Sequence, residues 1–206
     1  MILVHHLRIG RPLFTVWLLE ELGLDYKLKI YERDPKTMRA GPELREAHPL
    51  GKSPVIEDDG LVLAETGAIA AYLIDNYDSE GAFAPPRDRR VARARYEQWM
   101  HYPEGSAFTP LLMTMLLARS EEPVPKLISR FAEGETALHL GYIESELGDK
   151  SFILGDRLQG PDIGLSYIVS MARRLGLIED RARLRAYLDR VQARPAFARA
   201  LARAGA

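Results

Sequence analysis

Two short stretches of the chain combine residue types that recognise a peptide. The first is Lys52, Ser53, Pro54 and Val55, where a proline opens a predicted strand. A cis proline there would leave the backbone N–H and C=O of Ser53 unpaired and facing outward, so that an extended peptide could pair with them as an added strand. An ordinary strand-opening proline explains the same residues equally well, and both interpretations stay open.

The second stretch, Glu65 to Ile69, lies where a strand is expected to turn into a helix. The start of a helix offers unpaired backbone N–H groups and a positive dipole end to a carboxylate, and Thr66 adds a hydroxyl donor. Glu65 could pair with an ammonium group. One turn would then recognise both charges of an α-amino acid, although helix capping alone is the competing interpretation.

Composition narrows the classes of function. The 206 residues include 28 basic and 29 acidic side chains, so no net field attracts nucleic acid or an anionic membrane. The chain has no cysteine, which excludes thiolate metal sites and catalysis by a thiol of its own. We assign no metal ligand, and any sulfur chemistry must use a sulfur brought by a ligand. Because Met1 to Leu7 lacks a long apolar core and no long apolar run follows, we expect a cytoplasmic protein without a membrane span.

The elements that would position these residues follow from changes in hydrophobic period over residues 1–83. Alternation predicts strands and helical spacing predicts helices, in the order β-α-β-α-β-β-α, which is a thioredoxin-like arrangement. Strands are predicted over 2–6, 26–31, 54–57 and 61–64, and helices over 12–22, 42–47 and 65–77.

Residues 78–88 contain Gly81, Pro85 and Pro86 and little apolar periodicity, which indicates an interdomain linker. Everything after this linker has helical spacing. We therefore predict two domains: an α/β thioredoxin-like domain over 1–83 and an all-α domain over 84–206. Helices are predicted over 89–102, 110–119, 125–147, 161–175, 181–194 and 195–204.

Together these features resemble the glutathione S-transferase family over nearly the whole chain. The matching stretches are Trp17 to Gly23 (WLLEELG), His48 to Val55 (HPLGKSPV), Leu63 to Ile69 (LAETGAI), and Phe152 to Arg157 (FILGDR) with Asp162. The stretch Trp99 to Ser106 (WMHYPEGS) is similar to the bacterial and fungal cytosolic transferases of this family.

The resemblance implies a glutathione site on the first domain, with glutathione as a co-substrate and no tightly bound cofactor. The cysteinyl backbone of glutathione would pair with Ser53 before Pro54, the γ-glutamyl head group would bind Glu65 and Thr66, and Lys52 would lie near a glutathione carboxylate. The resemblance gives Asp162 a structural part, in a helix-capping turn where Gln159 replaces the usual Ser or Thr.

A second substrate, a small hydrophobic electrophile, would by the same resemblance bind near His101, Tyr102 and Met113. Core packing is the competing explanation for these three side chains. The family also implies a homodimer, in which Glu104 or a neighbour reaches the partner's γ-glutamyl site.

The sequence departs from the family pattern at the position whose side chain would contact the thiol of glutathione. Related proteins place a Ser or Tyr hydroxyl just after the first strand, but Gly10, Arg11 and Pro12 stand there. A positive charge and a helix N-terminus also stabilise a thiolate, so Arg11 and the backbone N–H groups that follow it are candidates, with Tyr102 as a hydroxyl from the second domain. His5 and His6 are adjacent on a strand, so at most one of them faces the site.

Two functions stay open. The first is an enzyme that conjugates glutathione to an electrophile or carries out a related glutathione-dependent reduction. The second is a non-catalytic glutathione-binding or protein-interaction module of the same fold. Gly10 and Pro12 favour the second, whereas Ser53, Pro54, Glu65 and Thr66 favour retained glutathione binding.

Overall fold

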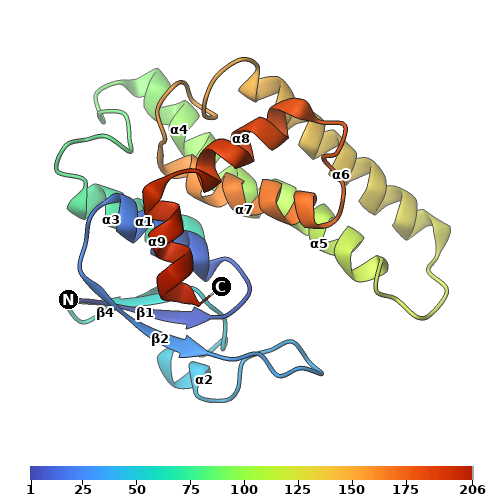
Figure 1. Cartoon of the computed structure of the whole chain (residues 1–206), viewed down its shortest axis with the longest axis horizontal. Helices are drawn as coiled ribbons and strands as arrows, with labels where there is room; N and C mark the ends of the chain where they lie inside the picture. Colours follow the sequence, from blue (N-terminus) through green and yellow to red (C-terminus); the bar gives the residue numbers. More distant parts are fainter. Residues whose placement is uncertain (206) are drawn as a thin grey trace. The chain divides into compact units, whose positions relative to one another are not determined.

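The computed structural model describes residues 1–205, and its contacts form two compact units (Figure 1). The first unit joins residues 1–81 to the C-terminal segment that begins at Gln192, and the second unit is Ala82–Val191. The predicted domain boundary between residues 83 and 84 stays a prediction.

The first unit is built on a four-stranded sheet with the order β2-β1-β3-β4. Strand β1 pairs parallel with β2 and antiparallel with β3, and β4 forms an antiparallel hairpin with β3. The predicted element order is confirmed, and the boundaries move by one or two residues. The elements are β1 (Ile2–Leu7), α1 (Pro12–Glu21), β2 (Tyr26–Tyr31), α2 (Leu44–Ala47), β3 (Val55–Asp58), β4 (Leu61–Ala64) and α3 (Thr66–Tyr77).

Helix α9 (Pro195–Ala204) packs on α1 in this first unit (Figure 1). The Phe197 ring contacts Trp17 edge-on, with ring centroids 5.5 Å apart, and burial of these aromatic rings stabilises the pair of helices. Glu20 accepts hydrogen bonds from Arg199 at 2.7 Å and Arg203 at 3.1 Å. Arg199 and Arg203 of α9 therefore neutralise the Glu20 carboxylate of α1.

The second unit contains only helices among its described residues. They are α4 (Arg90–Tyr102), η1 (Pro103–Ala107), α5 (Phe108–Leu117), α6 (Lys126–Leu147), α7 (Gly160–Arg174) and α8 (Ala182–Gln192, whose last residue begins the C-terminal segment). We expected a break between residues 102 and 110, and the structure instead continues through a π-helical turn. This turn runs from Pro103 to Ala107, and Pro103 fits at its first position because the missing backbone N–H of a proline is least costly at the start of a helical segment.

Asp162 holds the start of α7 in the core of the second unit. Its buried carboxylate accepts hydrogen bonds from the backbone N–H of Ile153 at 3.1 Å, the N–H of Gln159 at 3.0 Å and the Tyr187 hydroxyl at 3.1 Å. These bonds give Asp162 a part in folding. Within residues 1–205, no helix is both long enough and apolar enough to cross a membrane.

Candidate functional site

Three chain segments of the first unit meet at one edge of the sheet. Val55 at the start of β3 pairs with Ala64 at the end of β4, so Pro54 and Glu65 lie next to each other where the hairpin opens. The Ser53 hydroxyl donates to the His5 carbonyl at 2.5 Å and accepts from the Leu7 N–H at 3.1 Å. The segment before β3 is therefore fixed to the end of β1, beside the start of α3.

The Ser53–Pro54 peptide bond is cis, which is one of the two interpretations that the sequence left open. Strand β3 begins only at Val55, and no residue in the described chain forms a hydrogen bond with the backbone N–H or C=O of Ser53. A backbone with both groups available can pair with an extended peptide. The side chain of Ser53, in contrast, is occupied by β1.

Glu65 occupies a backbone conformation that favours glycine, with φ of 71° and ψ of 119°. Such a conformation costs a non-glycine residue on the order of 1–3 kcal/mol and is concentrated at binding sites. The Glu65 side chain is exposed, and in the described part of the chain its carboxylate has no hydrogen-bond or ion-pair partner. An exposed carboxylate on a constrained backbone can receive an ammonium group.

Helix α3 begins at Thr66, whose side chain is buried. The first intrahelical bond of this turn runs from the Ile69 N–H to the Glu65 carbonyl at 2.9 Å, so the N–H groups of residues 66 to 68 have no acceptor within the helix. These N–H groups, at the positive end of the helix dipole, can bind a carboxylate.

Lys52 precedes Ser53 and is exposed. Its ammonium group forms no ion pair with any of residues 1–205, so its charge is available to a ligand. The structure thus brings Lys52, Ser53 and Pro54 to the same edge of the sheet as Glu65 and Thr66.

Residues 10–12, where the family pattern places a hydroxyl beside the glutathione thiol, have no hydroxyl side chain. Arg11 directly precedes α1, and Pro12 is the first residue of this helix. Pro12 has no N–H of its own, so the donors of this turn begin at Leu13, whose N–H is 3.4 Å from the Gly10 carbonyl.

Sequence reasoning missed Arg33, which lies two residues after the end of β2. Its guanidinium donates to the Arg8 carbonyl from Nε at 2.8 Å, to the Ile9 carbonyl from Nη2 at 2.8 Å, and to the Met38 carbonyl from Nη1 at 2.6 Å. These bonds hold the β1–α1 loop, residues 8–11. The parallel pairing of β1 and β2 is the signal that would have found Arg33, because the residues after two parallel strands share one edge.

The two adjacent histidines of β1 point to opposite faces of the sheet. The buried His5 ring places Nδ1 2.7 Å from the Tyr31 hydroxyl and Nε2 2.7 Å from a Glu57 carboxylate oxygen. The His6 ring is buried, and in the described chain neither of its nitrogens has a hydrogen-bond partner. Burial, aided by the positive charge of Arg8, lowers the pKa of His6 to about 4.

The residues expected to bind a second substrate belong to the second unit. The Tyr102 hydroxyl is 2.6 Å from Nδ1 of His139, and burial, with a further contribution from Tyr142, raises the pKa of Tyr102. His101 is exposed at the end of α4, and Met113 is half-buried on α5. A role of these three residues in binding an electrophile stays a prediction.

Comparison with known proteins decides the family. The family model "Glutathione S-transferase, N-terminal domain" matches residues 1–75. Glutathione S-transferase 3 of Schizosaccharomyces pombe is 31% identical over 186 residues, which cover 84% of this chain and 75% of that protein. The chain belongs to the glutathione S-transferase family. The predicted family and fold are therefore confirmed.

Solved structures of transferases agree with this assignment. A glutathione S-transferase from Actinobacillus pleuropneumoniae is 33% identical and superposes with a TM-score of 0.90, over 100% of this chain and 93% of that one. A glutathione transferase family member from Pseudomonas fluorescens is 25% identical, with a TM-score of 0.83 over 97% of this chain and 92% of that one. The Pseudomonas structure has two glutathione molecules bound.

Proposed function

We propose that this member of the glutathione S-transferase family binds glutathione on its first unit and transfers it to a small hydrophobic electrophile, or uses it in a related reduction. The observation that carries the proposal is the position of Ser53 and cis-Pro54 beside Glu65 and the N-terminus of α3. Ser53 would pair with the cysteinyl backbone. Glu65 would bind the ammonium of the γ-glutamyl head group, and Thr66 with its neighbouring N–H groups would bind the carboxylate of that head group.

Positive charge, in place of a hydroxyl, would activate the thiol. Arg11 is part of the β1–α1 loop, and the Arg33 guanidinium donates hydrogen bonds to carbonyls of this loop. Helix α1 begins directly after the loop. A nearby cation and a helix N-terminus both lower the pKa of a thiol, because they stabilise the thiolate and not the neutral form. The thiolate is the nucleophile that attacks the electrophile.

The remaining parts of the proposal come from the family. The electrophile would bind near His101, Tyr102 and Met113, and the protein would act in the cytoplasm as a homodimer. Glu104 of one copy, or a neighbour, would reach the γ-glutamyl site of the other copy.

A second candidate function is a glutathione-binding or interaction module without catalysis. The specific observation in its favour is Gly10, which has no side chain where a hydroxyl is expected, and whose neighbourhood holds the Arg33 guanidinium. Glutathione binding would persist in this case, but the bound thiol would titrate as it does in water.

Calorimetry with glutathione, followed by ultraviolet titration of the bound thiol, separates the two functions. S-Methylglutathione serves as the matched blank because it binds through the same backbone but has no thiol to ionise. A lowered thiol pKa and turnover of at least one electrophile support the enzyme. Binding with an unshifted thiol and no turnover supports the glutathione-binding module. The absence of glutathione binding contradicts both the enzyme and the glutathione-binding module, and leaves the protein-interaction module.

A further inference from the structure

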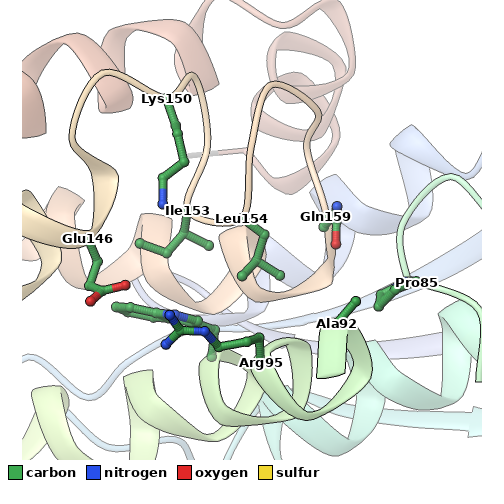
Figure 2. Close-up of a pocket in the computed structure, with 9 residues that line it drawn as sticks. Pro85, Ala92, Arg95, Glu146, Lys150, Ile153, Leu154 and Gln159 are labelled. Carbon is green, nitrogen blue, oxygen red and sulfur yellow. The ribbon is translucent and has the colours of Figure 1, made fainter. Parts of the chain in front are cut away.

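The second unit contains a pocket of about 280 Å³, and all the residues that line this pocket belong to the second unit. Helix α4 forms one wall, and the loop between α6 and α7 forms the other (Figure 2). The pocket is lined by Pro85, Ala92, Arg95, Trp99, Glu146, Lys150, Ile153, Leu154 and Gln159.

The apolar part of this pocket is rigid. Trp99 is buried, and its ring stacks on Tyr142 with ring centroids 5.4 Å apart and an interplanar angle of 10°. Ile153 is also buried, and its backbone N–H bonds to the Asp162 carboxylate at 3.1 Å. An apolar ligand would therefore meet walls that are already fixed, which lowers the entropic cost of binding.

Three charged side chains lie at one end of the pocket. Figure 2 shows Lys150 pointing from the loop toward α4, where Arg95 lies, with the Glu146 carboxylate on the same side. In the part of the chain that the structure describes, none of the three side chains has a hydrogen-bond or ion-pair partner. Two cations against one carboxylate leave this end with a net positive charge, and no internal ion pair has to break before an anion binds.

We propose that this pocket binds a small aromatic carboxylate. Its ring would pack against Trp99, Ile153 and Leu154, and its carboxylate would lie between Arg95 and Lys150. The volume is close to the lower limit for ligand pockets, so one ring with a short acidic chain fits the space, whereas a tripeptide such as glutathione does not. This site is separate from the edge of the first unit proposed for glutathione, and it does not depend on the thiol chemistry.

The test is calorimetry of the full chain with 3-phenylpropionate and with 3-phenylpropionamide, which has the same shape but no charge. We expect the acid to bind more tightly than the amide. Arg95→Gln and Lys150→Gln should each weaken the acid by about twofold to fivefold, the range for an exposed ion pair, and Glu146→Gln should strengthen it. Lys126→Gln, which changes an exposed lysine outside the pocket, is the matched control and should leave the affinity unchanged.

Tryptophan fluorescence locates the bound acid. Trp17 and Trp99 are the two tryptophans of the chain, so Trp17→Phe leaves Trp99 as the reporter. Saturable quenching of Trp99 by the acid that persists with glutathione present supports the site. Equal binding of acid and amide, unchanged affinity in both Arg95→Gln and Lys150→Gln, displacement by glutathione, or no saturable binding would each overturn it.

Discussion

The Arg33 guanidinium stands where a side chain on residue 10 would begin: a Cβ built on Gly10 would lie 3.1 Å from Nη2 of Arg33. Transferases of this family usually place their hydroxyl in this region, after the first strand. This chain has a cation beside the place of the missing hydroxyl. The relationship pairs the absent side chain of residue 10 with a cation from the segment that follows β2.

Arg33→Gln should raise the pKa of bound glutathione's thiol, because the thiolate loses a nearby positive charge. A rise of one unit corresponds to about 1.4 kcal/mol and to roughly tenfold less thiolate at a pH below the thiol pKa. The rate of conjugation at neutral pH should fall accordingly, and its pH profile should move to higher pH. Ultraviolet titration of the bound thiol and the pH dependence of kcat/KM measure both effects.

Two further variants separate charge from loop structure. Arg33→Lys keeps the charge but loses the planar fork that bonds to the three carbonyls, so it should raise the thiol pKa less than Arg33→Gln does. Arg39→Gln removes an exposed charge from the segment between β2 and α2, which also contains Arg33, and is the control. Equal shifts in Arg33→Gln and Arg33→Lys would indicate that Arg33 acts only by holding the β1–α1 loop. No shift in either would leave Arg11 as the candidate, which Arg11→Ala tests in the same assay.

Gly10→Ser should not increase turnover if Arg33 already serves the thiolate. The new Cβ would press on the end of the Arg33 side chain, which must move by a few tenths of an ångström, and the loop would lose part of its hold. We expect a cost of about 1 kcal/mol, which is roughly 2–4 °C in Tm for a chain of this size. Thermal unfolding and steady-state kinetics check the two effects. A clear gain in kcat/KM would show that the hydroxyl was simply absent.

Glu65→Gln and Thr66→Ala should each weaken glutathione binding. A charge-assisted hydrogen bond contributes about 1.5–3 kcal/mol, so the dissociation constant should rise by roughly tenfold to a hundredfold. Calorimetry on the purified variants measures the change. Glu80→Gln alters an exposed carboxylate in the turn after α3 and is the matched control, and wild-type affinity in both site variants would contradict the assignment of the head group.

Much of the first unit was predictable because its local signals agree with the fold. Alternating apolar residues marked the strands, Pro12 opened α1 at the position where its missing N–H costs nothing, and Pro54 marked the start of β3. The residues proposed to bind glutathione could be predicted to lie together for the same reason. They lie at the ends of elements, and the hairpin that joins β3 to β4 brings them together over only a dozen residues.

Contacts between segments far apart in the sequence were harder to predict, because they depend on how the elements pack against each other. Arg33 reaches the β1–α1 loop only because β2 pairs parallel with β1, with Leu7 opposite Tyr31. The contact of Phe197 with Trp17 likewise requires the chain to return to the first unit after the whole helical unit. Apolar spacing shows that a helix has a buried face, but it does not show which partner covers that face.

The buried ring of His6 has a pKa lowered to about 4 from the ordinary value of 6.5. In the unfolded chain the ring takes up a proton near pH 6.5, whereas the folded state resists protonation until about pH 4. The unfolded state therefore binds more protons between these values, and the free energy of unfolding should fall as the pH decreases through this window. The expected loss of stability between pH 7 and pH 5 is about 2 kcal/mol.

Denaturant unfolding followed through Trp17, in a Trp99→Phe background that makes Trp17 the reporter of the first unit, measures this loss. His6→Leu removes the titrating ring and should largely abolish the pH dependence, whereas the exposed His101→Gln should keep it. An equal loss of stability in His6→Leu and in the parent would show that another group causes the acid sensitivity.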